Sequence, residues 1–195
     1  PTRRSSDLYV TNAARQAVSV PLLNAGTHNP ESAVELIQSG TADFAMIGRG
    51  LIADPNLPNK LLADQREDVR PCLRCNENCI GRIWNNHTKL GCSVNVQAME
   101  ERRFKLEAAE TAKKIVVIGG GAAGMEAARV AKLRGHEVAL YEAGPRLGGM
   151  MRDVSTAKFK INIQLLSQWY EKQMEKLGID VHLNTFIRPD VPILT

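Results

Sequence analysis

The sequence predicts an α/β protein built from parallel strands and helices, and three observations predict this class. Residues 18–64 alternate short apolar runs with helical patterns, and residues 114–141 repeat a strand, a turn, a helix and a second strand. The chain has 195 residues, of which 44% are apolar and 24% are charged. That composition excludes a wholly disordered protein.

Charge and cysteine usage narrow the functional classes. The 25 Lys and Arg residues exceed the 21 Asp and Glu residues by four without any polybasic block, so neither nucleic acid nor a membrane surface is indicated as a partner. Apolar runs such as Ile115–Ile118 are too short to span a bilayer. All four cysteines lie between Cys72 and Cys92, which favours a metal site in a reducing compartment over a disulfide scaffold. We therefore expect a cytoplasmic protein that acts on a small-molecule substrate.

The N-terminal zone has the order strand, helix, strand, helix. Pro1–Leu8 resembles a translated sequencing adapter, so we expect residues 1–8 to be a non-native tail and the chain to be a fragment. Asn29 is a candidate N-cap with Pro30 at the first helical position. The other predicted elements are strands at Val18–Leu23 and Asp43–Ile47 and a helix at Asn56–Asp64.

The C-terminal zone contains three predicted strands and two helices. The strands are Lys114–Ile118, Glu137–Tyr141 and Ile179–Leu183, and the first helix ends near Arg134. A long amphipathic helix ends at Gly178, and its apolar stripe, which we expect in the core, comprises Phe159, Ile163, Leu166, Tyr170 and Leu177. Met99–Lys113, rich in charge, is predicted to be a solvated connector with some helix.

The cysteine spacing is Cys72-x2-Cys75-x3-Cys79-x12-Cys92. Three thiolates within eight residues face one point only if the backbone curls around it. Zinc usually takes two separated pairs of ligands, whereas a cubane iron–sulfur cluster takes one thiolate on each iron atom. The spacing therefore favours a cluster, with zinc or structural thiols as alternatives.

A glycine motif follows the strand Lys114–Ile118 and opens a helix. Gly119-x-Gly121-x-x-Gly124 permits a tight turn, close approach to a pyrophosphate and close packing of helix on strand. Glu142, 18 residues beyond Gly124, ends the next strand, where a carboxylate accepts hydrogen bonds from ribose hydroxyls. These residues are compatible with either FAD or NAD. Leu147-Gly148-Gly149 favours FAD, because a second close approach of the backbone to the ligand suits a longer dinucleotide.

A weaker signal follows the two N-terminal strands. Gly26 and Gly48-Arg49 come at the carboxyl ends of consecutive predicted strands. If the sheet is a barrel, loops at this position bind phosphate. A loop glycine and a surface arginine are the alternative interpretation.

The order of these motifs resembles one enzyme family. Residues 20–60, with Ala25-Gly26, Asn29-Pro30-Glu31 and Gly48–Pro55, resemble the last two βα units of old-yellow-enzyme-like flavin barrels. Arg70-Pro71-Cys72 through Asn95 resembles the iron–sulfur segment of 2,4-dienoyl-CoA reductases, enoate reductases and trimethylamine dehydrogenase. Lys114–Gly149 resembles their FAD domain.

The resemblance implies a site for each cofactor. Gly26, Gly48 and Arg49 would hold the FMN phosphate, and Cys72, Cys75, Cys79 and Cys92 would ligate a 4Fe–4S cluster. FAD would be lined by Gly119, Gly121, Ala123, Gly124, Glu142 and Gly149. Two positions depart from the family pattern, because Val96 replaces a usual Pro and Met150 replaces a common Gln.

The implied fold is the C-terminal end of a (β/α)8 barrel, a cysteine-rich cluster loop and the start of a Rossmann-like FAD domain. The boundaries are residues 9–66 for the barrel units, 67–98 for the iron–sulfur segment, 99–113 for the connector and 114–195 for a partial FAD/NAD(P)-binding domain. A full barrel needs about 250 residues, and the resemblance implies that the catalytic side chains lie on earlier barrel strands. We therefore expect no activity from this chain alone.

The implied function is a flavin-dependent, iron–sulfur oxidoreductase. NAD(P)H would reduce FAD, the cluster would carry electrons singly to FMN, and FMN would reduce an activated C=C bond of an enoate or an enoyl- or dienoyl-CoA. Within the same family, an amine dehydrogenase would pass electrons in the opposite direction, from an amine to FMN and then to an external acceptor. Two other classes remain as alternatives: an electron-transfer module without FMN, and a zinc-stapled nucleotide-binding module without redox activity.

Overall fold

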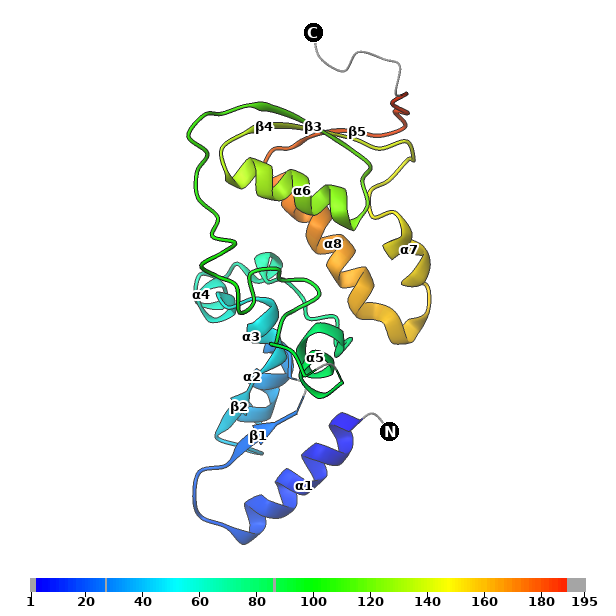
Figure 1. Cartoon of the computed structure of the whole chain (residues 1–195). Helices are drawn as coiled ribbons and strands as arrows, with labels where there is room; N and C mark the ends of the chain where they lie inside the picture. The colour runs from blue at the N-terminus through cyan, green and yellow to red at the C-terminus, as the bar shows by residue number, and fades with distance from the viewer. Residues whose placement is uncertain (1–2, 27, 86, 189–195) are drawn as a thin grey trace.

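The computed structural model describes residues 3–26, 28–85 and 87–188, and it contains two parallel sheets. Strands β1 (Leu23–Ala25) and β2 (Phe44–Met46) form the first sheet. The second has the order β3-β4-β5, with bounds Lys114–Ile118, Glu137–Tyr141 and Asp180–His182. Figure 1 shows the two sheets toward opposite ends of the molecule, with the cysteine-bearing segment between them. The parallel α/β class is therefore confirmed for the described residues.

The N-terminal sheet is shorter than the sequence predicts. The prediction of a strand at Val18–Leu23 is wrong, because pairing begins only at Leu23, opposite Phe44. Pro21 lacks the N–H that a ladder requires, so residues before it stay outside the sheet. Helix α1 (Arg3–Ala17) precedes β1 and runs through part of the segment 1–8, whose non-native origin stays a prediction.

The helix between these strands begins as predicted. In α2 (Pro30–Gln38), the Asn29 side chain accepts the Ser32 N–H at 3.0 Å, and the Ser32 hydroxyl accepts the Asn29 N–H at 3.0 Å. This reciprocal capping box satisfies amide donors that the helix leaves free. Asn29 is thus confirmed as the N-cap.

The middle of the chain consists of short helical turns. The elements are α3 (Arg49–Ala53), α4 (Leu57–Leu62), the 3₁₀ turn η1 (Arg66–Asp68), the π-helix η2 (Glu77–Gly81) and α5 (Arg82–Trp84). Residues 99–113 form turns and irregular backbone, so the helix expected in this connector is wrong. The segment has no apolar stripe to bury, and short helices in water need one.

The C-terminal sheet is covered by two long helices. Helices α6 (Ala122–Leu133) and α8 (Ile161–Lys176) lie against one face of the sheet in Figure 1. Met125 of α6, Leu140 of β4 and Met174 of α8 are the largest fully buried side chains among the described residues. Phe159 is 83% exposed, so its predicted core position is wrong. It lies in the turn η3 (Lys158–Lys160) before α8 begins, and the shorter helix α7 (Met150–Val154) comes before that.

One hydrophobic core joins the cysteine segment to this C-terminal unit. Ala53 and Val94 belong to the same buried cluster as Met125 and Trp169, and Cys72 and Cys92 pack against it. None of the helices formed by the described residues is long and apolar enough to cross a membrane.

Candidate functional site

The four cysteine side chains are reduced and line one small cavity. Its other walls are apolar side chains, the amides of Asn76 and Asn78, the hydroxyl of Ser93 and the guanidinium of Arg49. The structure thus brings Cys72, Cys75, Cys79 and Cys92 to one cavity, and their role as cluster ligands stays a prediction. The cavity holds about 20 Å³, so a group larger than one water requires the exposed loop at Cys75 to open. In the described residues, no three or more His, Cys, Asp or Glu side chains are arranged to hold a metal ion.

The backbone of the cysteine loop curls by means of left-handed residues. Arg74 has φ 57° and Asn76 has φ 63°, on either side of Cys75. The π-helix then carries Cys79 back toward the cavity, and π-helical turns are frequent at functional sites. Asn76 has a second role, because its carbonyl accepts the Gly81 N–H at 2.8 Å.

Hydrogen bonds reach two of the sulfur atoms. The Arg74 amide donates to Cys72 Sγ at 3.4 Å, and the Ser93 hydroxyl lies 3.4 Å from Cys75 Sγ. Burial raises the pKa of the Cys72 thiol, while the Arg74 amide and the Arg49 guanidinium act in the opposite direction. The loop thus supplies one backbone donor to sulfur, and Ser93 supplies a polar contact to another, the kind of contact that tunes bound clusters.

The glycine loop between β3 and α6 has the geometry that the motif predicts. Gly119 has φ +101°, a conformation that residues with a side chain rarely adopt. A Cβ on Gly124 would lie 1.8 Å from the Gly119 carbonyl oxygen, so helix and turn pack too closely for any larger residue. At Gly119 and Gly121, by contrast, a Cβ would meet nothing within 4 Å, which leaves open space in front of the loop. Ala123 lies exposed in the first turn of α6.

Glu142 is anchored to this loop. Its Oε2 accepts the Gly120 N–H at 2.7 Å and its Oε1 accepts the Gly144 N–H at 2.7 Å. These two backbone donors, Gly144 first, lower the pKa of Glu142. A carboxylate has about four lone-pair positions, so it retains acceptors for further donors such as ribose hydroxyls.

The segment Leu147–Gly149 lies directly against the glycine loop. The Gly148 N–H donates to the Gly120 carbonyl at 2.8 Å, and a Cβ on Gly149 would lie 3.2 Å from the Gly121 Cα. The second backbone approach expected after Glu142 is therefore present. Gly120 and Gly144, the partners of Glu142, were not predicted as site residues, because Gly120 is an unspecified position of the glycine motif and Gly144 lies outside the motif.

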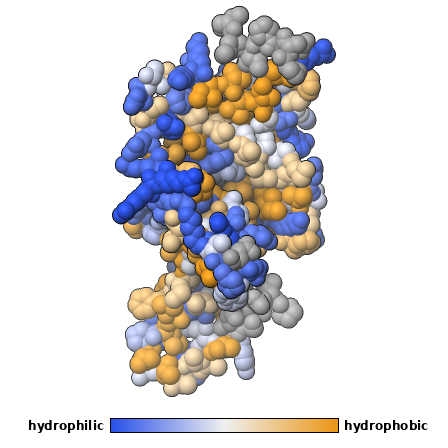
Figure 2. All heavy atoms as spheres, in the orientation of Figure 1, coloured by the Kyte–Doolittle hydropathy of each residue, from blue (hydrophilic) through white to orange (hydrophobic). Residues whose placement is uncertain are grey.

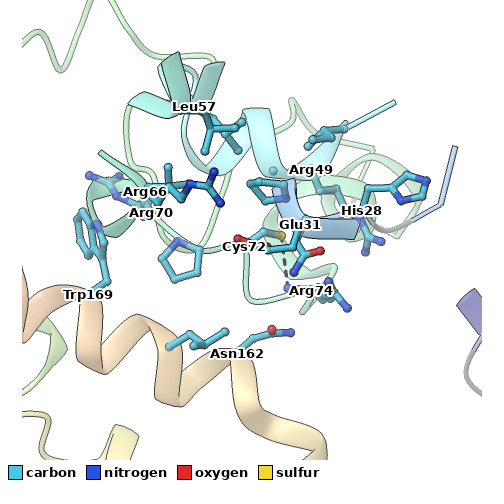
Figure 3. Close-up of a pocket in the computed structure, with 18 of the residues that line it drawn as sticks. His28, Glu31, Arg49, Leu57, Arg66, Arg70, Cys72, Arg74, Asn162 and Trp169 are labelled. Atoms are coloured by element: carbon cyan, nitrogen blue, oxygen red, sulfur yellow. Dashed lines mark hydrogen bonds between the residues drawn. The ribbon is translucent and has the colours of Figure 1, made fainter. Parts of the chain in front are cut away.

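A larger cleft of about 1140 Å³ contains the third set of predicted residues. Gly26, Gly48 and Arg49 all line it, because Ala25 is paired with Met46 and the two strands end side by side. Helix α8 closes the other side with Asn162 and Trp169, as Figure 3 shows. The cleft passes close to Cys72, which also lines it.

Trp169 connects the cysteine segment to the two long helices. Its Nε1 donates to the Asp68 carbonyl at 3.0 Å. The Arg70 guanidinium lies 4.9 Å from the ring centroid, and the Arg129 guanidinium of α6 lies 5.6 Å from it. Trp169 is only 6% exposed. The sequence predicts an apolar stripe on this helix but gives no indication of the partners of Trp169, of which Asp68 lies 101 positions away and Arg129 lies 40 positions away.

The comparisons with known proteins agree with this arrangement. The family model described as pyridine nucleotide-disulphide oxidoreductase matches residues 86–190, more than half of the chain. The chain belongs to this family. The match covers the glycine loop, Glu142 and the segment that follows, so it supports the use of a flavin and a pyridine nucleotide.

Relatives extend the likeness across the N-terminal half. Cinnamate reductase from Clostridium sporogenes is 40% identical over 187 residues, which are 94% of this chain and 28% of that protein. The solved complex of 2-naphthoyl-CoA reductase with 2-naphthoyl-CoA has a TM-score of 0.86 and 30% identity over 91% of this chain and 27% of that one.

A third relative is an amine oxidase. The 6-hydroxypseudooxynicotine amine oxidase from Pseudomonas geniculata N1 has a TM-score of 0.86 and 27% identity, over 93% of this chain and 28% of that one. The resemblance to the old-yellow-enzyme-like iron–sulfur flavoenzymes is thereby confirmed. This chain spans little more than a quarter of the length of each of these relatives.

Proposed function

We propose that this chain is part of a flavin- and iron–sulfur-dependent oxidoreductase. The enzyme uses NAD(P)H to reduce the activated C=C bond of an enoate or of an enoyl- or dienoyl-CoA. The observation that carries the proposal is that four free thiols line one cavity, and two of them, Cys72 and Cys92, pack against the hydrophobic core that also takes up Val117 and Met125 on either side of the glycine loop. Neither feature alone distinguishes a redox enzyme from a stapled nucleotide-binding module.

The residues fit the three cofactors to different degrees. The open space before Gly119 and Gly121, with Glu142 beside it, fits the pyrophosphate and ribose of FAD. The thiols have the donor chemistry for a 4Fe–4S cluster, once the loop at Cys75 opens to admit it. Gly26, Gly48 and Arg49 supply a glycine-lined surface and one cation for the phosphate of FMN.

When bound, the flavins supply hydride transfer and the cluster supplies single-electron transfer. The residues of this chain would bind and orient these cofactors. The glycine loop brings the positive end of α6 toward phosphates, Glu142 accepts hydrogen bonds, and the buried contacts of Trp169 hold the cysteine segment at a fixed place beside α6 and α8.

The activity is tested on the full-length protein that contains this chain. Anaerobic enzyme is mixed with NADH or NADPH and with either cinnamate or a 2-enoyl-CoA, and the saturated product is measured. We expect reduction of at least one of the two substrate classes. Reduction of neither, in enzyme that has a full complement of flavin and iron, would contradict the proposal.

The FAD site is tested by Gly121→Val. Gly121 has φ −78° and a Cβ there meets nothing within 4 Å, so the fold accepts the substitution. The new side chain would occupy the space that a pyrophosphate needs. We expect retained secondary structure with loss of bound FAD, and undiminished FAD would count against the assignment.

Amine oxidation is the second candidate, favoured by the amine oxidase relative. In that case a secondary or tertiary amine would reduce the enzyme and an external acceptor would take the electrons. Anaerobic bleaching of the flavin by an amine, without bleaching by NAD(P)H, would favour this candidate over C=C reduction.

A further inference from the structure

Arg49 belongs to both candidate sites of the N-terminal half. It lines the large cleft with Gly26 and Gly48, and it also lines the thiol cavity. Its Nη1 donates to Oδ1 of Asn76, which lies between Cys75 and Cys79 in the cysteine loop. A residue that serves only as a phosphate ligand in the cleft does not require a partner in that loop.

Asn76 is a rigid partner for this arginine. It has φ 63°, and its carbonyl accepts the Gly81 N–H at 2.8 Å at the start of the π-helix. Both its conformation and its carbonyl are therefore fixed by the loop. A side chain on a fixed backbone is a good anchor for a long, flexible guanidinium group.

Arg49 is also the charged member of the thiol cavity. Of the described residues that line this cavity, Arg49 is the one with a charged side chain. Other cationic side chains of the cleft, such as Arg66 and Lys172, do not line the thiol cavity. Among the residues that line this cavity, the positive charge therefore comes from Arg49 at the start of α3.

We propose that Arg49 is a positioning residue of the cysteine site whose guanidinium, anchored by Asn76, raises the reduction potential of the bound cluster. One-electron reduction adds a negative charge to the cluster, and a nearby cation favours the more negative state. The inference rests on the proposed function, because it requires an iron–sulfur cluster on the four thiolates.

The test is an EPR-monitored redox titration of the full-length protein, after iron and sulfide have been counted. We expect Arg49→Gln to lower the equilibrium constant for one-electron reduction about tenfold, a shift of about 59 mV to more negative potential. Arg49→Lys keeps the charge, so its potential should stay near that of the unsubstituted protein. The matched control is Arg66→Gln, which removes a guanidinium from the cleft but not from the thiol cavity.

A further variant tests the anchor alone. Asn76→Gly removes the acceptor, and glycine tolerates φ 63°. We expect a shift in the same direction as for Arg49→Gln but smaller, with FMN content unchanged. An unchanged potential in Arg49→Gln with four iron atoms present would overturn the inference and leave the proposed function intact. Zinc in place of iron in the unsubstituted protein would overturn both.

Discussion

The two sheets of this chain differ in how completely they are packed. In the C-terminal sheet, Leu140 is fully buried beneath α6 and α8, and β4 is paired on both sides. In the N-terminal sheet, Phe44 is 57% exposed, and each three-residue strand has one unpaired edge among the described residues. Figure 2 shows apolar side chains at the surface of the end of the molecule that carries β1 and β2.

The difference shows what makes a binding motif self-sufficient. The hydrogen-bond partners of the glycine loop lie within residues 114–149, and Gly120 of the loop donates to the Glu142 carboxylate and accepts the Gly148 N–H. Gly26, Gly48 and Arg49 share a cleft but make no comparable network with one another in the described residues. Isolated two-stranded sheets are marginally stable, so this half depends on its contacts with the cysteine segment and α8.

The largest expected effect comes from the residue that joins the halves. Trp169→Ala removes a buried ring, its bond to the Asp68 carbonyl and its contacts with Arg70 and Arg129. We expect the free energy of unfolding of the chain to fall by about 3–5 kcal/mol in urea denaturation. The control is Trp84→Ala, 72% exposed on α5, which should change it by about 0.5 kcal/mol or less. Equal decreases in the free energy of unfolding for the two variants would show that Trp169 does not join the two halves.

Two glycines sharpen the comparison between the halves. Gly124→Ala forces a Cβ to within 1.8 Å of the Gly119 oxygen, so the turn must distort at a cost of about 1–3 kcal/mol. Gly48→Ala meets nothing within 4 Å, and its φ of −82° suits alanine. We expect the midpoint temperature of thermal unfolding to fall clearly for Gly124→Ala and to stay unchanged for Gly48→Ala. The reverse order would contradict the tight packing assigned to the glycine loop.

A smaller effect is expected at Glu142. Glu142→Gln loses the charge that strengthens two backbone hydrogen bonds, with an expected cost of about 1 kcal/mol. Because the pKa of Glu142 is lowered in the folded chain, its stabilisation is complete above the ordinary value of 4.5 and is lost as the pH falls through the lowered pKa. The free energy of unfolding, measured by urea titration, should therefore change less between pH 7 and pH 3 in the variant than in the unsubstituted protein. Exposed Glu137→Gln is the matched control.

The sequence predicts the C-terminal unit well because its signals are local. Lys114–Ile118 and Glu137–Tyr141 are strands with the predicted bounds, and Glu142 lies beside the glycine loop as expected. The two failures concern local features that the prediction did not weigh. Pro21 excludes the predicted strand from its sheet, and no apolar stripe supports a helix in the connector.

Side-chain partners far apart in sequence were beyond prediction. Trp169 meets Asp68 across 101 positions, and Arg49 meets Asn76 across 27. Periodicity identifies which face of a helix is buried, but it does not identify what that face packs against. The role of Arg49 in the thiol cavity therefore required the structure.

The central claim is that the four thiols hold a 4Fe–4S cluster. The direct measurement is the iron, zinc and acid-labile sulfide content of the protein after anaerobic reconstitution, together with that of Cys75→Ser. We predict a brown protein with about four iron and four sulfide per chain, and loss of most of both in the variant. One zinc per chain without sulfide would contradict the account.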